Sequence, residues 1–226
     1  MDPTRSHLLA ADADRLRKTL VDEQAAWGQR IQATLFDLGL PALPDSARGD
    51  CARGRLAELE LPQAARERIE VCVQMIDAIE HQLAPIDREL RRFSREQAGC
   101  RALTEHFGIG PLTAPVILAE LGDVSRLRRS RQAVRMASLD VGVERSDRRT
   151  RIGKLTKQGS PDLRWALYEA AQSTCQPTSP DRGDYLQLRE RRLSPTQASL
   201  TIARKLARRR YHTLRELGPA ALEEPA

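Results

Sequence analysis

The sequence predicts a mainly α-helical protein, in which a helical coiled-coil hairpin is followed by a compact helical domain containing a helix-hairpin-helix. Aromatic residues make up only 4% of the 226 residues, which fits a helical Ala/Leu/Ile core better than a β-sandwich. Apolar residues recur at heptad spacing through residues 62–97, and short helical segments alternate with Gly-containing turns from residue 101 onward. We therefore expect a hairpin over 1–100, a second domain over 101–217 and a frayed tail at 218–226.

The first expected element is a long helix over residues 5–38. Its apolar residues repeat at steps of seven and four, which lies close to the helical period of 3.6 residues. Gly39 and Pro41 signal the end of this helix, a loop over 41–50 follows, and a short helix is expected at 52–60. The apolar stripe consists of Leu9, Leu16, Leu20, Trp27, Ile31 and Leu38.

A second long helix is expected over residues 62–97, with two apolar seams. This regularity predicts a coiled coil, either antiparallel with the first helix or between two chains, and favours a homo-oligomer over a hairpin without a partner. Pro85 removes one backbone hydrogen bond and should kink the helix locally. One seam contains Ile69, Ile76, Leu83 and Leu90, and the other contains Cys72, Ile79, Ile86 and Phe93.

Positive charge is concentrated in the second half of the chain. The net charge is +6, and residues 1–100 carry 14 Lys/Arg against 17 Asp/Glu, whereas residues 101–226 carry 23 against 14. Within 126–165 the count is 12 basic to 4 acidic residues. Such a surface attracts phosphate through steering and counterion release, although a solvated basic face without a partner has the same composition.

A helix-hairpin-helix signature lies at residues 103–117. Gly108 and Gly110 bracket Ile109, and the glycines permit left-handed backbone angles and leave room for a phosphate oxygen near the N–H groups of the turn. Ile109 should point inward between the helices, and Pro111 suits the first turn of the second helix. Contacts of this kind do not depend on base sequence, so the motif implies DNA binding but specifies no target sequence. The alternative is a plain helical turn.

Residues 138–160 contain three serines in a basic, polar context. Ser138–Val143 predicts a short extended stretch, residues 144–159 predict an Arg/Lys-rich turn-forming loop, and Ser160-Pro161 begins a helix over 161–172. A serine among arginines is either an ordinary loop residue or a nucleophile that attacks a DNA phosphodiester while the arginines neutralise charge. The residues by themselves leave both interpretations open.

Several motifs together resemble a known family. They are Phe107-Gly108-Ile109-Gly110, Ala119-Glu120-Leu121-Gly122-Asp123, Ser146-Asp147, the run from Ile152 to Gly159, and Leu163-Arg164-Trp165-Ala166-Leu167 with Glu169-Ala170-Ala171. Across Arg101–Arg192 the chain resembles the transposase domain of the DEDD, Piv-type insertion-sequence transposases, the insertion-sequence family numbered one hundred and ten. That family is known for guidance by a bridge RNA.

The resemblance implies DNA transposition by serine-mediated strand exchange, with DNA and a bridge RNA as partners. By position the nucleophile is Ser146, although Asp147-Arg148 stands where the family usually has a glycine, and Ser138 and Ser160 compete for the role. The expected DNA-contacting residues are Gly108, Ile109, Gly110, Arg148, Arg149, Arg151, Lys154, Lys157 and Arg164.

No residue of this chain is expected to bind a metal or cofactor. Members of the family begin with a RuvC-like domain whose four acidic residues bind divalent metal, and no strand-rich segment with spaced acids precedes the first helix here. Magnesium is therefore expected only together with a RuvC-like partner domain. The alternatives are a non-catalytic DNA-binding or regulatory remnant that oligomerises, and an RNA-binding accessory protein.

The remaining expectations concern the C-terminal helix and the compartment. A helix over 194–217 should expose its basic residues as a solvated face or as extra phosphate contacts. The sequence has no run of 18 apolar residues and no signal-peptide core, and its four cysteines form no metal or disulfide pattern, so a cytoplasmic protein without membrane contact is expected. The basic residues of that helix are Arg204, Lys205, Arg208, Arg209 and Arg210.

Overall fold

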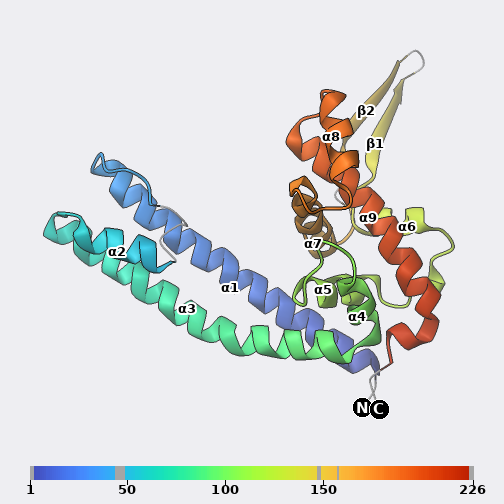
Figure 1. The fold of residues 1–226 in the computed structure, drawn as a ribbon, viewed down its shortest axis with the longest axis horizontal. Helices are drawn as coiled ribbons and strands as arrows, with labels where there is room; N and C mark the ends of the chain where they lie inside the picture. The colour runs from blue at the N-terminus through green and yellow to red at the C-terminus, as the bar shows by residue number, and fades with distance from the viewer. Residues whose placement is uncertain (1–2, 44–48, 147–148, 157, 224–226) are drawn as a thin grey trace. The chain divides into compact units, whose positions relative to one another are not determined.

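The computed structural model describes residues 3–43, 49–146, 149–156 and 158–223 (Figure 1). Most of them are helical, which confirms the mainly α prediction, and one antiparallel strand pair is added to it. The chain forms two compact units, residues 13–89 and residues 90–226 together with 1–12. The expected division lay at residue 100, but the last turns of the second long helix belong to the second unit, where Phe93 packs against the core.

The first unit is an antiparallel helical hairpin. Helix α1 (Pro3–Asp37) and helix α3 (Gln63–Glu96) are joined by polar contacts between their side chains. Arg17 Nε lies 2.6 Å from Asp87 Oδ1, and Gln24 Nε2 donates to Glu80 Oε1 at 2.9 Å. Because the residue numbers fall along one helix as they rise along the other, α1 and α3 run antiparallel.

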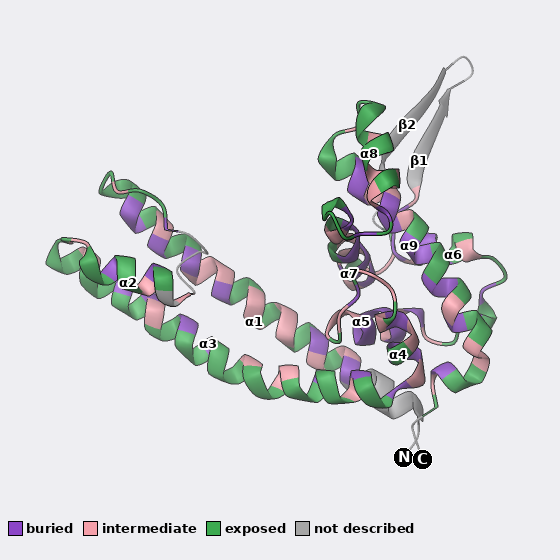
Figure 2. Ribbon diagram, in the orientation of Figure 1, coloured by how far each residue is buried: buried purple, intermediate pink, exposed green. Residues whose placement is uncertain are grey.

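Helix α2 (Asp50–Glu58) covers the end of the hairpin that is nearest to the loop after α1. Apolar residues from all three helices meet there and form a cluster of their own, separate from the core of the second unit. Figure 2 shows buried positions recurring along one side of each long helix. The cluster contains Ile31, Leu35, Leu43, Ala52, Leu56, Ile69, Cys72 and Ile76.

The predicted seam of α3 is correct, but the predicted stripe of α1 is only partly so. On α3, Ile69, Ile76 and Leu90 are buried, and the helix continues through Pro85 without a break. On α1, Leu16 is 53% exposed, whereas Gln24 is buried. The reason is that α1 turns polar side chains inward toward acids of α3, so its apolar period does not mark its buried side along its whole length.

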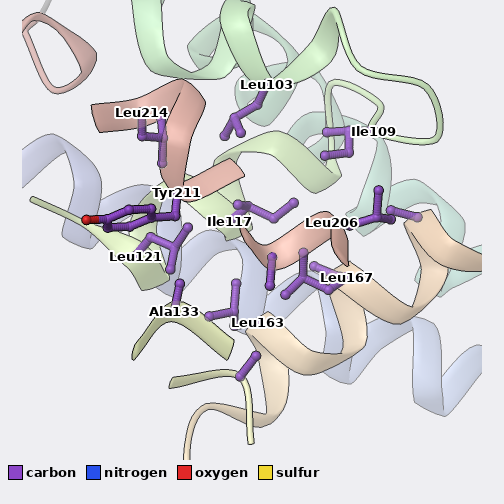
Figure 3. Close-up of a cluster of buried hydrophobic side chains, with 14 of the residues drawn as sticks. Leu103, Ile109, Ile117, Leu121, Ala133, Leu163, Leu167, Leu206, Tyr211 and Leu214 are labelled. Carbon is purple, nitrogen blue, oxygen red and sulfur yellow. The ribbon is translucent and has the colours of Figure 1, made fainter. Parts of the chain in front are cut away.

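The second unit has one continuous apolar core around helix α9 (Pro195–Leu217). Helix α9 packs against α4 (Ala98–Thr104), α6 (Ser130–Met136), α7 (Pro161–Gln172) and α8 (Arg182–Glu190). Ser194 caps α9, and its side chain accepts a hydrogen bond from the Gln197 N–H. Figure 3 shows side chains from several helices converging, among them Leu103, Ile117, Leu163, Leu206 and Leu214.

The tail was predicted to fray from residue 218, and this is wrong for its first residues. Gly218–Ala221 form a short 3-10 helix, η4, that packs against α4, and Ala221 is buried. Gly99 allows this approach because a Cβ atom there would lie 2.5 Å from the Ala221 carbonyl oxygen. The sequence gives no sign of this contact, which depends on α4 and α9 meeting in space.

An antiparallel pair of strands replaces the expected loop over 144–159. Strand β1 (Val141–Ser146) pairs with β2 (Arg149–Leu155), with a bulge between Val141 and Val143. The extended segment thus begins after Ser138 and reaches further than predicted, since cross-strand hydrogen bonds overrode the turn-forming composition. None of the described helices is both long enough and apolar enough to cross a membrane.

Candidate nucleic-acid interface

The helix-hairpin-helix prediction agrees with two helices around a short turn. The turn follows α4 and leads into α5 (Thr113–Leu121), and Ile109 is only 5% exposed, as expected for a residue that points inward. Helix α5 begins after Pro111, not at it, because the Gly110 carbonyl accepts the first hydrogen bonds, from Thr113 N at 3.1 Å and Ala114 N at 3.0 Å.

The two glycines of this turn have different roles. Gly108 has a φ of +83°, and a Cβ atom there would lie 2.6 Å from the Ala170 carbonyl oxygen of α7. Gly110 is not in the left-handed region, and a Cβ atom there would meet nothing within 4 Å. Gly108 is thus needed for packing against α7, and only Gly110 leaves open space at the turn, where a phosphate was predicted to approach.

A group of charged residues of α9 lies close to the same turn. His106 Nε2 is 2.8 Å from Thr213 Oγ1, and burial, followed by the nearby positive charge of Arg210, lowers the pKa of His106. Arg209 Nη1 contacts both carboxylate oxygens of Asp181 at 2.7 Å. Two arginines of α9 thus lie near His106; Arg209 is paired with Asp181, and Arg210 is buried.

The prediction that α9 exposes all its basic residues is wrong at two positions. Arg210 is 1% exposed, burial lowers its pKa to about 10, and its Nε and Nη1 atoms have no hydrogen-bond partner among the described residues. Arg204 donates from Nε to the Leu139 carbonyl at 2.7 Å, and burial lowers its pKa as well. Both residues are held by the fold because α9 is surrounded by other helices.

Two of the three candidate serines are occupied by structural contacts. Ser138 is buried with a φ of +51°, and its Oγ accepts a hydrogen bond from the Gly159 N–H. Ser160 caps α7, and its Oγ accepts from the Leu163 N–H at 3.0 Å. Ser138 is thus enclosed in the fold, whereas Ser160 is half-buried and serves as a helix cap.

The third serine, Ser146, ends strand β1. The backbone register pairs Ser146 with Arg149, Glu144 with Arg151, and Arg145 with Thr150. Alternate positions of a strand lie on one face of a ladder, and directly paired positions share that face. Positions 144, 146, 149 and 151 therefore belong to one face, and positions 145 and 150 to the other.

The base of this strand pair is fixed to the helices. The Thr156 N–H donates to the Asp140 carbonyl at 3.1 Å, and the Ser160 N–H donates to the Met136 carbonyl at 2.7 Å. A Cβ atom at Gly159 would collide with that same Met136 carbonyl oxygen. The segment that carries Ser146 is thus tied to the end of α6 and the start of α7.

The other predicted DNA contacts are dispersed along the same region. Lys154 lies in β2, and Arg164 lies in the first turn of α7, where its Nη1 is buried without a hydrogen-bond partner among the described residues. Arg148 and Lys157 lie outside the described residues. The structure therefore brings Ser146, Arg149 and Arg151 onto one ladder, whereas Arg164 lies in α7.

Sequence reasoning missed one group of arginines. Arg128, Arg129, Arg131 and Arg135 line a pocket beside α6, together with Gln132. The signal was present as four arginines within residues 126–131, but it was counted only as part of a charged window. The pocket becomes visible only once the buried side of α6 is known.

The described residues offer no ligand set for a metal ion. No group of three or more His, Cys, Asp and Glu side chains lies together among them in an arrangement that could hold one.

A helix-hairpin-helix turn and a basic strand pair are features typical of proteins that contact phosphate groups. Residues 100–187 match the sequence model of the Transposase IS116/IS110/IS902 family. This stretch of the chain is therefore similar to the transposase domain of that family.

Curated relatives extend the similarity beyond this domain. A "Probable family 20 transposase" of Pseudomonas aeruginosa is 26% identical over 204 residues, which are 86% of this chain and 60% of the relative. The "Insertion element IS116 uncharacterized 44.8 kDa protein" of Streptomyces clavuligerus is 27% identical over 192 residues, or 84% of this chain and 46% of the relative. A "Putative transposase" of Sinorhizobium fredii is 23% identical over 198 residues. The chain spans about half the length of these relatives.

Proposed function

We propose that this chain supplies the serine-bearing part of an insertion-sequence transposase, and that Ser146 is the nucleophile in strand exchange. The proposal rests on the hydrogen bonds and the positions of the three candidate serines. Ser138 and Ser160 have their Oγ atoms engaged by backbone N–H groups, whereas Ser146 ends a strand in the most basic part of the transposase domain.

In the proposed step the Ser146 Oγ attacks the phosphorus of a DNA phosphodiester. The bond from phosphorus to one deoxyribose oxygen breaks, that oxygen leaves with a proton as a hydroxyl group, and a phosphoserine link holds the other strand end. The energy of the phosphodiester is retained in that link. A hydroxyl group of a second strand can then attack the phosphoserine, which restores Ser146 and joins the strands.

Arginines at specific register positions support this chemistry. The face that contains position 146 also contains positions 149 and 151. Guanidinium groups there would neutralise the negative charge that develops on the phosphoryl oxygens in the transition state. Position 145 belongs to the opposite face, so Arg145 is expected to contribute less than Arg149 or Arg151.

The test is a covalent trapping experiment on the full chain. Labelled DNA carrying element ends is incubated with the protein, with and without a RuvC-like partner and Mg²⁺, and adducts are separated on a denaturing gel. We expect an adduct that disappears in Ser146→Ala. The matched control is Ser130→Ala, which removes a hydroxyl group in the same domain and should leave the adduct intact.

The absence of an adduct under both conditions would refute the catalytic proposal. It would favour the second candidate function, a DNA-binding or regulatory protein without catalysis. That candidate is favoured by the arginine-rich surface beside α6. An adduct that survives in Ser146→Ala would instead assign the nucleophile to another residue.

Self-association through the helical hairpin and contact with a guide RNA form the remaining part of the proposal. The hairpin exposes large apolar side chains at Phe36, Val71 and Met75, which a second copy could cover. Light scattering across micromolar concentrations should show a species larger than the monomer. A monomer at every concentration would refute the self-association.

A further inference from the structure

A pocket lies beside α6, and four of its five lining residues are arginines. It has a volume of about 410 Å³ and is lined by Arg128, Arg129, Arg131, Gln132 and Arg135. It shares no residue with the helix-hairpin-helix turn or with the strand pair that carries Ser146. The pocket is therefore a separate electropositive feature of the transposase domain.

The segment that carries these arginines is held to the core by hydrogen bonds and by buried side chains. Leu127 is buried, and its carbonyl oxygen accepts hydrogen bonds from Tyr211 Oη and Arg215 Nη1, each at 2.9 Å. On α6, Ala133 and Val134 are buried in the core. Because the apolar side of α6 faces α9, the arginines on its other side are exposed at fixed positions.

The positive charges of the pocket have almost no counter-charge. Arg128, Arg129 and Arg131 form no ion pair with any residue that the structure describes. Arg135 has one long contact, from Nε to Asp140 Oδ2 at 3.4 Å, and its side chain is 79% exposed. Several like charges around one concave surface repel one another, and a bound polyanion would remove that repulsion.

We propose that this pocket binds the phosphodiester backbone of a nucleic acid, as a second contact distinct from the one around Ser146. Guanidinium groups bind phosphate oxygens in a bidentate manner, and four of them around one pocket match consecutive phosphates better than a single anion. Gln132 adds an amide at the same place, although its Oε1 already accepts from the Arg129 N–H at 3.1 Å. The ligand is thus recognised by its backbone and not by its bases.

The position of α6 supports a contact away from the reacting phosphate. Strand β1 starts directly after the segment that follows α6 and ends at Ser146. Six residues of strand span roughly 20 Å, at about 3.3 Å each. The proposed contact is therefore to phosphates other than the one that Ser146 attacks.

The test compares two triple variants of the full chain with equal charge. The pocket variant is Arg128→Gln/Arg129→Gln/Arg131→Gln, and the control is Arg55→Gln/Arg88→Gln/Arg92→Gln, which removes three exposed arginines of α2 and α3. Binding to a DNA duplex and to an RNA duplex of the same length is measured as a function of salt. Each lost phosphate contact lowers the slope of log affinity against log salt by about 0.9.

We expect the pocket variant to lower that slope by about 2 to 3 for at least one of the duplexes, and the control to change it by less than about 0.5. A change with DNA alone identifies DNA as the ligand, and a change with RNA alone identifies RNA. Equal slopes for the pocket variant and the unmodified chain with both duplexes would overturn the proposal. The role of this contact in transposition rests on the proposed function, but its test does not. The salt slope is measured without any Ser146 adduct, so the two proposals can fail separately.

Discussion

The two units of this protein differ in how their helices are held together. In residues 13–89, polar pairs such as Arg17 with Asp87 join α1 to α3, and apolar packing is concentrated where α2 covers the hairpin. In residues 90–226, a continuous apolar core surrounds α9 on several sides. The candidate interface lies entirely on the second unit, where a rigid core can fix the positions of charged groups.

This contrast explains why the spacing of apolar residues predicted the buried positions of α3 better than those of α9. The heptads of α3 predicted its buried side correctly because that helix has one neighbour along most of its length. Helix α9 has neighbours on several sides, so even Arg210 is buried there. The number of packing partners, which a single helical stripe does not reveal, decides how much of a helix is buried.

The largest expected effect comes from removing core volume in the second unit. Leu163→Ala should lower the free energy of unfolding by about 3–5 kcal/mol, because a core packed from several sides cannot close the cavity. Ile76→Ala in the helical hairpin should cost about 2–3 kcal/mol, because two helices can move together more easily. Urea unfolding, followed by Trp165 for one unit and Trp27 for the other in single-tryptophan variants, measures both.

The exposed Leu186→Ala is the control for that comparison and should change stability by less than about 0.5 kcal/mol. Equal losses for Leu163→Ala and Ile76→Ala would show that the hairpin is as tightly packed as the second unit. That result would remove the physical basis for the contrast between the units.

A smaller effect should separate the two glycines of the helix-hairpin-helix turn. Gly108→Ala is expected to destabilise the protein by about 2–4 kcal/mol, through its positive φ and the collision with the Ala170 carbonyl. Gly110→Ala should stay within about 0.5 kcal/mol of the unmodified chain but weaken DNA binding if phosphate approaches the turn there. Thermal unfolding of both variants measures the change in stability, and a titration with DNA measures the change in affinity.

Similar stability of the two glycine variants would contradict the close packing of the turn against α7. Unchanged DNA binding by a folded Gly110→Ala protein would remove the turn from the interface. The predictions on the serine and on the arginine pocket would be unaffected by either result.

The smallest expected effect is a dependence of stability on pH at His106. Its pKa is lowered in the folded state, first by burial and then by Arg210, so the unfolded chain binds more protons between the two pKa values. Stability should therefore fall as the pH decreases below about 6.5, the ordinary value for histidine. The urea midpoint at pH 7.5 and pH 5.0 should differ less in His106→Gln than in the unmodified chain; an equal difference would exclude His106 as the cause.

Part of the candidate site could be predicted from residues alone. The Gly108-Ile109-Gly110 turn, the N-terminal cap of α7 at Ser160 and the basic window over 126–165 each depend on neighbours in sequence. The strand pair was missed because polar, Arg-rich residues favour a turn in isolation, and only pairing between β1 and β2 makes them extended. The burial of Ser138 likewise depends on a contact with Gly159, about twenty residues further along the chain, which no local pattern reveals.

By itself, the sequence determined the helical character, the heptad side of α3, the turn between α4 and α5, and the charge available for phosphate. These properties follow from local backbone preferences and from the spacing of residues along one element. The tertiary structure alone decided that Gly108 packs against α7, that Ser138 is buried, and that four arginines surround one pocket beside α6. Each of these depends on which elements meet in space, since burial and charge clustering are properties of the packed core.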